Sequence, residues 1–157
     1  MKKILILNKK WILLALLFPV LFSCTDKLDL KPSQSIDAEI ALSSPENIKA
    51  TLVGAYLSAR SQNIFGSRFN EYSELYAADG DMLFIGTYTE PREFINKEAT
   101  ITNAYVEATW SRAYNLINVC NTLLDEEVLG MLDDDDRDLV EGEARFLRGW
   151  TIFEMTR

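Results

Sequence analysis

The chain has 157 residues, with 16 Lys and Arg against 24 Asp and Glu and no His, so its net charge is −8. Nucleic acid is an unsuitable partner for this composition, because binding a phosphate backbone needs clustered Lys and Arg. The missing His removes the commonest general base and a common zinc ligand. We therefore expect no catalytic residues, no metal site and no cofactor.

The first 23 residues have the pattern of an export signal. Four lysines and no acid accompany an apolar run at residues 11–22, and Ser23 alone separates this run from Cys24. A run of 12 residues is shorter than the roughly 18 that a helix needs to span a bilayer. We predict a signal peptide over residues 1–23, whose removal leaves 134 residues with a net charge of −12.

The residues around the predicted cleavage point suggest a lipid anchor. The segment Leu21-Phe22-Ser23-Cys24 resembles the bacterial lipoprotein box, in which the Cys is lipidated and becomes the mature N-terminus. Two acyl chains, palmitate among them, would give stable membrane anchoring. Asp26 resembles the acid of the export tag that sends lipoproteins to the outer face of the outer membrane. Ordinary secretory cleavage beside an incidental Cys is the alternative.

The mature chain begins with a polar stretch and continues into a helix. Residues 24–36 are too poor in apolar side chains to form a core, and we expect them to act as a tether. Ser44-Pro45-Glu46 then has the pattern of a helix start: an N-cap, Pro at the first position and an acid in the first turn. We predict a helix over about residues 45–60. Its buried face is formed by side chains at three- and four-residue spacing, namely Ile48, Leu52, Ala55, Tyr56 and Ala59.

Residues 61–101 are rich in aromatic side chains but have no sustained periodicity, because glycines and Pro91 interrupt them. We predict a short helix over residues 71–78, a turn at residues 79–81 and otherwise an ordered loop region. Long loops of this kind on a helical scaffold are often functional.

A long helix is predicted from about Asn103 to Glu127, with Thr102 or Asn103 as its cap. We expect Cys120, which lies in the apolar pattern, to pack as a small hydrophobic side chain. The predicted buried stripe consists of Trp110, Ala113, Tyr114, Ile117, Asn121 and Leu124.

The last predicted helix begins near Asp135, where four consecutive acids at residues 133–136 interact favourably with the helix dipole. These acids lack the ligand spacing of an EF-hand calcium loop. The apolar residues that follow predict a helix buried almost all round. No partner helix follows it, so we expect the chain to be the front part of a longer protein. A complete domain whose last helix packs back on the others is the alternative.

Two helical segments carry a resemblance to a known family. The pattern Trp110-x₃-Tyr114-x₂-Ile117-x₃-Asn121 and the segment 143–153, EARFLRGWTIF, are similar to the SusD/RagB family of nutrient-binding outer-membrane lipoproteins. Gly54-Ala55-Tyr56 is similar to that family as well. The chain departs from it at Gly142 and Gly149, where Ala is usual. A glycine costs up to about 1 kcal/mol of helix stability, so these positions affect stability or close packing.

The resemblance implies a mainly α fold of tetratricopeptide-like helix pairs, an α-α superhelix with long irregular loops. Residues 37–157 would be an incomplete N-terminal SusD-like helical domain. Members of the family sit on SusC-like TonB-dependent transporters in the outer membrane and pass them oligosaccharides, or sometimes peptides, without chemistry.

Candidate ligand-binding residues follow from what a sugar needs, which is aromatic platforms and polar hydrogen-bonding groups. We single out Asp79, Asp81, Tyr88 and Trp110. The bland alternative is that the aromatic residues belong to the core and that the two aspartates only form a turn.

Two other functions compete with glycan capture. The first is a helical-repeat adaptor lipoprotein that binds a protein partner. The second is a glycosidase, which needs two carboxyl groups at a set separation in a cleft, and nothing in the sequence pairs them.

Overall fold

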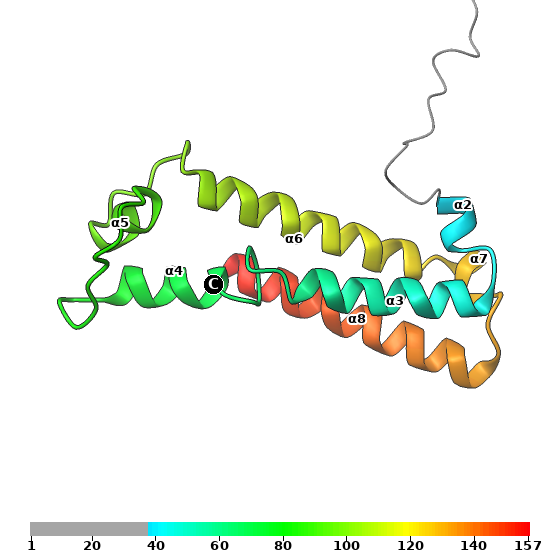
Figure 1. The fold of residues 1–157 in the computed structure, drawn as a ribbon. Coiled ribbons are helices and arrows are strands. Elements are labelled where there is room, and N and C mark those ends of the chain that lie inside the picture. Colours follow the sequence, from blue (N-terminus) through cyan, green and yellow to red (C-terminus); the bar gives the residue numbers. More distant parts are fainter. Residues whose placement is uncertain (1–37) are drawn as a thin grey trace, which may run out of the picture. The chain divides into compact units, whose positions relative to one another are not determined.

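A computed structural model describes residues 38–157 (Figure 1). The predicted signal peptide, the lipidated Cys24 and the tether lie outside the described residues. The part of the chain that is described contains helices and no strand, which confirms the mainly α prediction. The helices are α2 (Ala38–Ala41), α3 (Pro45–Ala59), α4 (Arg68–Ala77), α5 (Glu90–Ile95), α6 (Ala104–Leu123), α7 (Glu126–Leu129) and α8 (Asp134–Thr156).

Three long helices, α3, α6 and α8, pack against one another along their lengths (Figure 1). Helices α6 and α8 run antiparallel, with α7 between them in the chain, as in a tetratricopeptide-like pair. At one end of these helices lie α4 and α5, and at the other lie α2 and α7. The fully buried core side chains include Ile48, Leu116, Leu123, Val140 and Leu147. The tetratricopeptide-like architecture is therefore confirmed.

Side-chain caps fix the starts of the three long helices. Ser44 Oγ accepts from the backbone N–H of Asn47 at 3.3 Å at the start of α3. Asn103 Oδ1 caps α6 by accepting from the N–H groups of Tyr105 and Val106. Asp133 Oδ1 accepts from Asp136 N–H at 2.9 Å at the start of α8. Each cap satisfies backbone donors that the first turn leaves free, and all three helices begin within a residue of the predicted positions.

The region of residues 61–101 contains more helix than expected. Helix α4 begins at Arg68, three residues before the predicted start, and α5 was not predicted at all. Pro91 was interpreted as a helix breaker, but it lies in the first turn of α5. The fixed φ of proline and its missing N–H suit that position.

The predicted helix over residues 103–127 is wrong at its C-terminal end. Helix α6 ends at Leu123, and a separate short helix, α7, follows. Asp125 has an extended backbone and accepts a hydrogen bond from Glu127 N–H at 2.9 Å, so it caps α7 instead of continuing α6. A carboxylate in this position favours a new helix start.

The predicted buried faces need three corrections. On α3, Tyr56 is 40% exposed, although the other four predicted positions are buried. On α6, Trp110 and Tyr114 are exposed, and of the predicted stripe only Ala113 is fully buried. The residues of α6 that are buried instead are Thr109, Ala113, Leu116, Cys120 and Leu123.

On α8, one face is buried and the opposite side is open, so the expectation of burial almost all round is wrong for residues 38–157.

Candidate functional site

Helices α5 and α6 meet at Asn103, which is 2% exposed. While Asn103 Oδ1 caps α6, its Nδ2 donates to Glu93 Oε2 at 2.9 Å and to the carbonyl of Glu90 at 3.2 Å. The same Glu93 oxygen accepts from the backbone N–H of Thr100 at 3.1 Å and from its hydroxyl at 3.2 Å. The hydrogen bond from Asn103, followed by that from the Thr100 backbone, holds the pKa of Glu93 below its ordinary value. This network fixes α5 against the first turn of α6.

A second set of contacts joins α4 to α6. The guanidinium of Arg68 lies over the ring of Tyr105, with 3.3 Å from its Cζ to the ring centroid, and pairs with Glu71 at 2.8 Å. The Tyr72 hydroxyl donates to the carbonyl of Tyr105 at 2.6 Å and lies 2.7 Å from Thr109 Oγ1. Burial raises the pKa of Tyr72. These contacts hold α4 and the first half of α6 in a fixed relation.

A groove runs between α4, the first half of α6 and the last turn of α8, and we call it the aromatic groove. It encloses about 170 Å³. Its walls are mostly apolar, with the two hydroxyls of Tyr72 and Thr109 and the carboxylate of Glu154. The lining residues are Phe69, Tyr72, Val106, Thr109, Trp110, Glu154 and Met155.

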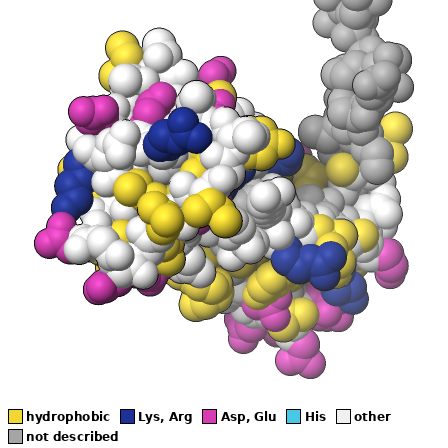
Figure 2. Space-filling view, turned by 60° about the vertical axis from the view of Figure 1, so that its left-hand side comes forward, with side chains coloured by type: hydrophobic (Ala, Val, Ile, Leu, Met, Phe, Trp, Pro, Cys, Tyr) yellow, Lys and Arg dark blue, Asp and Glu magenta, His cyan; other side chains and the backbone are white. Residues whose placement is uncertain are grey.

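The wall on α6 ends in an exposed aromatic pair. Trp110 is 58% and Tyr114 49% exposed, and their ring centroids lie 4.7 Å apart. On the face of the molecule that Figure 2 shows, hydrophobic side chains gather in the middle and acidic ones lie mainly toward the edges. Flat aromatic faces open to solvent can stack on the CH faces of a sugar ring.

Glu154 supplies a polar group to this groove. Its Oε1 accepts from the indole N–H of Trp150 at 3.3 Å. Its Oε2 is buried and pairs with the guanidinium of Arg157 at 2.8 Å. A neighbouring hollow, which also contains Tyr76 and Arg157, shares Phe69, Tyr72 and Glu154 with the groove.

Of the four predicted ligand-binding residues, Trp110 lines the aromatic groove, and the other three are not among its lining residues. Asp79 follows α4 and lies 3.3 Å from Lys97 Nζ, with its side chain 92% exposed. Asp81 is exposed in the following turn. Tyr88 is 64% exposed, and its ring centroid lies 6.5 Å from that of Tyr105. No contact among residues 38–157 brings all four together.

Sequence reasoning missed Tyr72 and Glu154 as groove residues. Tyr72 belongs to the aromatic-rich segment, but its position beside Trp110 depends on how α4 packs on α6. Glu154 lies four residues after Trp150, a spacing that places both on one side of a helix. That spacing was the one available signal.

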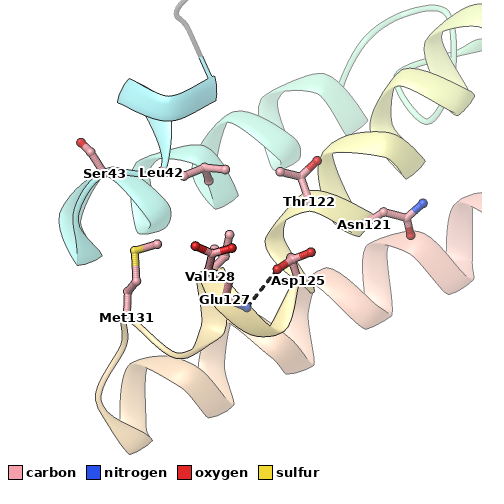
Figure 3. A pocket seen from close by; sticks show the side chains of 8 residues that line it. All are labelled: Leu42, Ser43, Asn121, Thr122, Asp125, Glu127, Val128 and Met131. Carbon is pink, nitrogen blue, oxygen red and sulfur yellow. Dashed lines mark hydrogen bonds between the residues drawn. The ribbon is translucent and has the colours of Figure 1, made fainter.

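A second hollow lies at the opposite end of the long helices, between the α2–α3 connection, the end of α6 and α7 (Figure 3). It encloses about 690 Å³ and has no aromatic side chain. Two of its polar side chains are already engaged, because Asn121 Oδ1 accepts from Arg148 and Asp125 caps α7. The lining residues are Leu42, Ser43, Asn121, Thr122, Asp125, Glu127, Val128 and Met131. This hollow is less suited to a sugar than the aromatic groove.

Two further observations concern the side chains and helices of residues 38–157. Within this range, no three His, Cys, Asp or Glu side chains are grouped so that they would hold a metal ion. No helix of the described part is both long and apolar enough to cross a membrane.

The fold and the groove together define a helical-repeat protein with a surface suited to binding. The sequence profile of the SusD-like family, described as "starch-binding associating with outer membrane", matches residues 26–157. The chain therefore belongs to the SusD-like family, which is a family of binding proteins associated with the outer membrane. This confirms the predicted SusD/RagB relationship. No curated protein and no solved structure matches the chain.

Proposed function

We propose that this protein is a lipid-anchored surface lipoprotein without enzymatic activity that captures glycans and delivers them to a SusC-like TonB-dependent transporter. The observation that carries the proposal is the family match over residues 26–157. The lipoprotein box at Cys24 supports anchoring in the outer membrane with the protein facing the exterior. The described residues support binding through an exposed aromatic pair beside a carboxylate.

We assign ligand contact to the aromatic groove, with Trp110 as its platform. Trp110 would stack on a sugar ring, and the Glu154 side chain lines the same groove as a polar group. Asp79, Asp81 and Tyr88 lie on the neighbouring loop region, where they would extend the contact for a longer oligosaccharide. The acidic charge of the protein favours neutral glycans over uronic-acid polymers.

Isothermal titration of the chain with a linear α-glucan oligosaccharide, the ligand class named for the family, tests this assignment. We expect Trp110→Ala to weaken binding by about 1 kcal/mol, or about fivefold in Kd. Phe146→Ala is the matched control, because Phe146 is also 58% exposed but lies on α8 outside the groove. Equal effects of the two substitutions on the Kd would refute the assignment of ligand binding to the aromatic groove. Binding of peptides but of no sugar would refute glycan capture.

The anchor and the transporter need separate experiments. Cells fed labelled palmitate should label the wild-type protein and Cys120→Ala but not Cys24→Ala, and label that persists in Cys24→Ala would refute the anchor. The protein purified from outer membranes should retain a TonB-dependent transporter. Recovery of a different partner instead would support the adaptor function, for which the exposed apolar residues of α8 are the favouring observation.

A further inference from the structure

The connection between α4 and α5 contains Asp79 followed directly by Gly80. In the whole sequence, no other Asp and no Asn precedes a glycine. The side-chain carboxyl of an Asp can be attacked by the backbone nitrogen of the next residue, because the two groups are near enough to close a small ring. A glycine hinders this attack least because it has no Cβ. The sequence therefore has one place where the reaction is sterically easiest.

The carboxylate of Asp79 is held only weakly. It lies in the turn after α4, and its side chain is 92% exposed. Its one polar contact within residues 38–157 is with Lys97, whose Nζ lies 3.3 Å from Oδ1 and which is itself half-exposed. An exposed ion pair of this kind contributes little. The side chain can therefore leave Lys97 and turn toward the backbone at small cost.

The attacking nitrogen, that of Gly80, is also free within the described part of the chain. Its N–H donates no hydrogen bond among residues 38–157, and residues 79–85 belong to no helix or strand. Gly80 has a φ of 101°, which glycine adopts without strain, and a Cβ placed there would meet nothing within 4 Å. Ring closure at this nitrogen therefore breaks no hydrogen bond of the described fold.

Three other aspartates show what distinguishes this place from exposure alone. Asp81 is exposed in the same segment, but the residue after it is Met82, which carries a Cβ beside the nitrogen that would attack. Asp125 and Asp133 each accept a hydrogen bond through Oδ1 as the caps of α7 and α8. A capping carboxylate would have to leave its helix start before it could react. Of these four aspartates, Asp79 alone combines an exposed carboxylate with a following glycine.

We propose that Asp79 is a site of spontaneous isomerisation to isoaspartate. The nitrogen of Gly80 bonds to Cγ of the protonated Asp79 carboxyl, and the hydroxyl of that carboxyl leaves with the hydrogen of the nitrogen as one water. The product is a cyclic succinimide. Water then opens the ring at one of its two carbonyls. Addition at Cγ restores aspartate, whereas addition at the backbone carbonyl carbon of Asp79 gives isoaspartate, in which the chain runs through Cβ and Cγ. The two steps need no oxidant, and the final product has the mass of the starting chain.

Isomerisation changes the connection after α4 in two ways. The backbone gains one methylene group between Asp79 and Gly80, and the free carboxylate then sits directly on the α-carbon of residue 79. Because that carboxylate has lost the reach of the side chain, we expect the contact with Lys97 to be lost as well. The turn after α4 would thus change with the age of the molecule, whichever ligand the protein binds.

Incubation of the purified full chain at neutral pH and physiological temperature tests the site. Trypsin should release residues 69–92 as one peptide, because no Lys or Arg lies between Arg68 and Arg92. We expect a second form of this peptide, of equal mass and different retention, to accumulate with time, and electron-transfer fragmentation should place the isoaspartate at residue 79. Asp81 in the same peptide is the internal control, and a sample digested at zero time corrects for isomerisation during digestion. Absence of isoaspartate at Asp79, or a rate no higher than that at Asp81, would overturn the proposal.

Two variants test the parts assigned to the two residues. Asp79→Glu keeps a carboxylate opposite Lys97, but its longer side chain must close a larger ring, so the isomer of the peptide should form many-fold more slowly. Gly80→Ala adds a Cβ beside the attacking nitrogen and should slow the reaction several-fold, and thermal unfolding of the same sample shows whether the chain stays folded. Formation of the isomer at the wild-type rate in Asp79→Glu would refute the site. An unchanged rate in Gly80→Ala would refute the part assigned to the glycine.

Discussion

The side-chain amide of Asn103 donates a 2.9 Å hydrogen bond to the carboxylate of Glu93 and so joins α5 to the first turn of α6. The same amide group caps α6 through its oxygen, so one buried residue fixes both a helix start and the helix before it. Tyr88 and Tyr105 flank this joint along the chain. The joint between α5 and α6 therefore rests on the Glu93 carboxylate with its three donor groups and on the hydrogen bond from Asn103 to the carbonyl of Glu90.

We predict that Glu93→Gln destabilises the protein at neutral pH. The pKa of Glu93 lies below its ordinary value of 4.5 in the folded state, so the folded chain binds a proton less readily than the unfolded chain. The contribution of Glu93 is therefore complete above pH 4.5 and is lost as the pH falls through the lowered pKa. Thermal unfolding of wild type and Glu93→Gln should converge at low pH. Glu98→Gln, an exposed neighbour, is the control, and identical curves for the two variants would contradict the prediction.

Sequence patterns located most helices but could not choose between two adjacent apolar stripes on α6. Trp110 and Tyr114 form one stripe, while Thr109, Leu116 and Cys120 form the next one around the helix. Both have helical spacing, and the larger aromatic side chains suggested the wrong face. Which stripe is buried depends on the rotation of α6 against α3 and α8, and that rotation is a tertiary property.

The candidate site was less accessible to prediction than the fold. Trp110 was selected as an aromatic platform, but its neighbours Phe69 and Glu154 lie about 40 positions away on either side in the sequence. Their proximity depends on how α4 and α8 pack on α6. Contacts within one helix follow more directly from the sequence, because Arg145 pairs with Glu141 at a four-residue spacing. Arg148 instead donates to Asn121 on α6 at 2.8 Å, a contact that depends on the packing of α6 and α8.

Replacing Gly142 and Gly149, the two glycines inside α8, should stabilise the protein. Gly142→Ala and Gly149→Ala should each raise the free energy of unfolding by up to about 1 kcal/mol, because alanine favours the helix and the added Cβ meets no neighbour. Denaturant titration followed by circular dichroism measures the change.

Gly66→Ala provides the contrast. A Cβ there would lie 2.6 Å from the carbonyl oxygen of Arg60 and 2.8 Å from that of Ser61, so the backbone would have to move. We expect this variant to be less stable than wild type. A higher free energy of unfolding for Gly66→Ala would contradict the assigned packing. So would a lower one for both Gly142→Ala and Gly149→Ala.

Two leucines of α8 should respond differently to truncation. Leu147 is 1% exposed in the core, and Leu147→Ala should cost about 2–5 kcal/mol of unfolding free energy through lost burial and the cavity left behind. Leu139 is 47% exposed, so Leu139→Ala should cost less than about 1 kcal/mol. Denaturant midpoints of the two variants give the comparison. Similar losses would mean that the face of α8 assigned to the core is wrong.

Cys120 should be unreactive in the folded protein. It is 0% exposed between core side chains of α6, and burial raises the pKa of its thiol, so little reactive thiolate forms at neutral pH. In a Cys24→Ala background, where Cys120 is the only thiol, a disulfide reagent should react slowly in buffer and rapidly in denaturant. Adding Asn115→Cys to that background supplies an exposed thiol as the fast reference. Native labelling of Cys120 at the reference rate would show that the region between α6 and α8 is open, which would contradict the packing from which the aromatic groove was assigned.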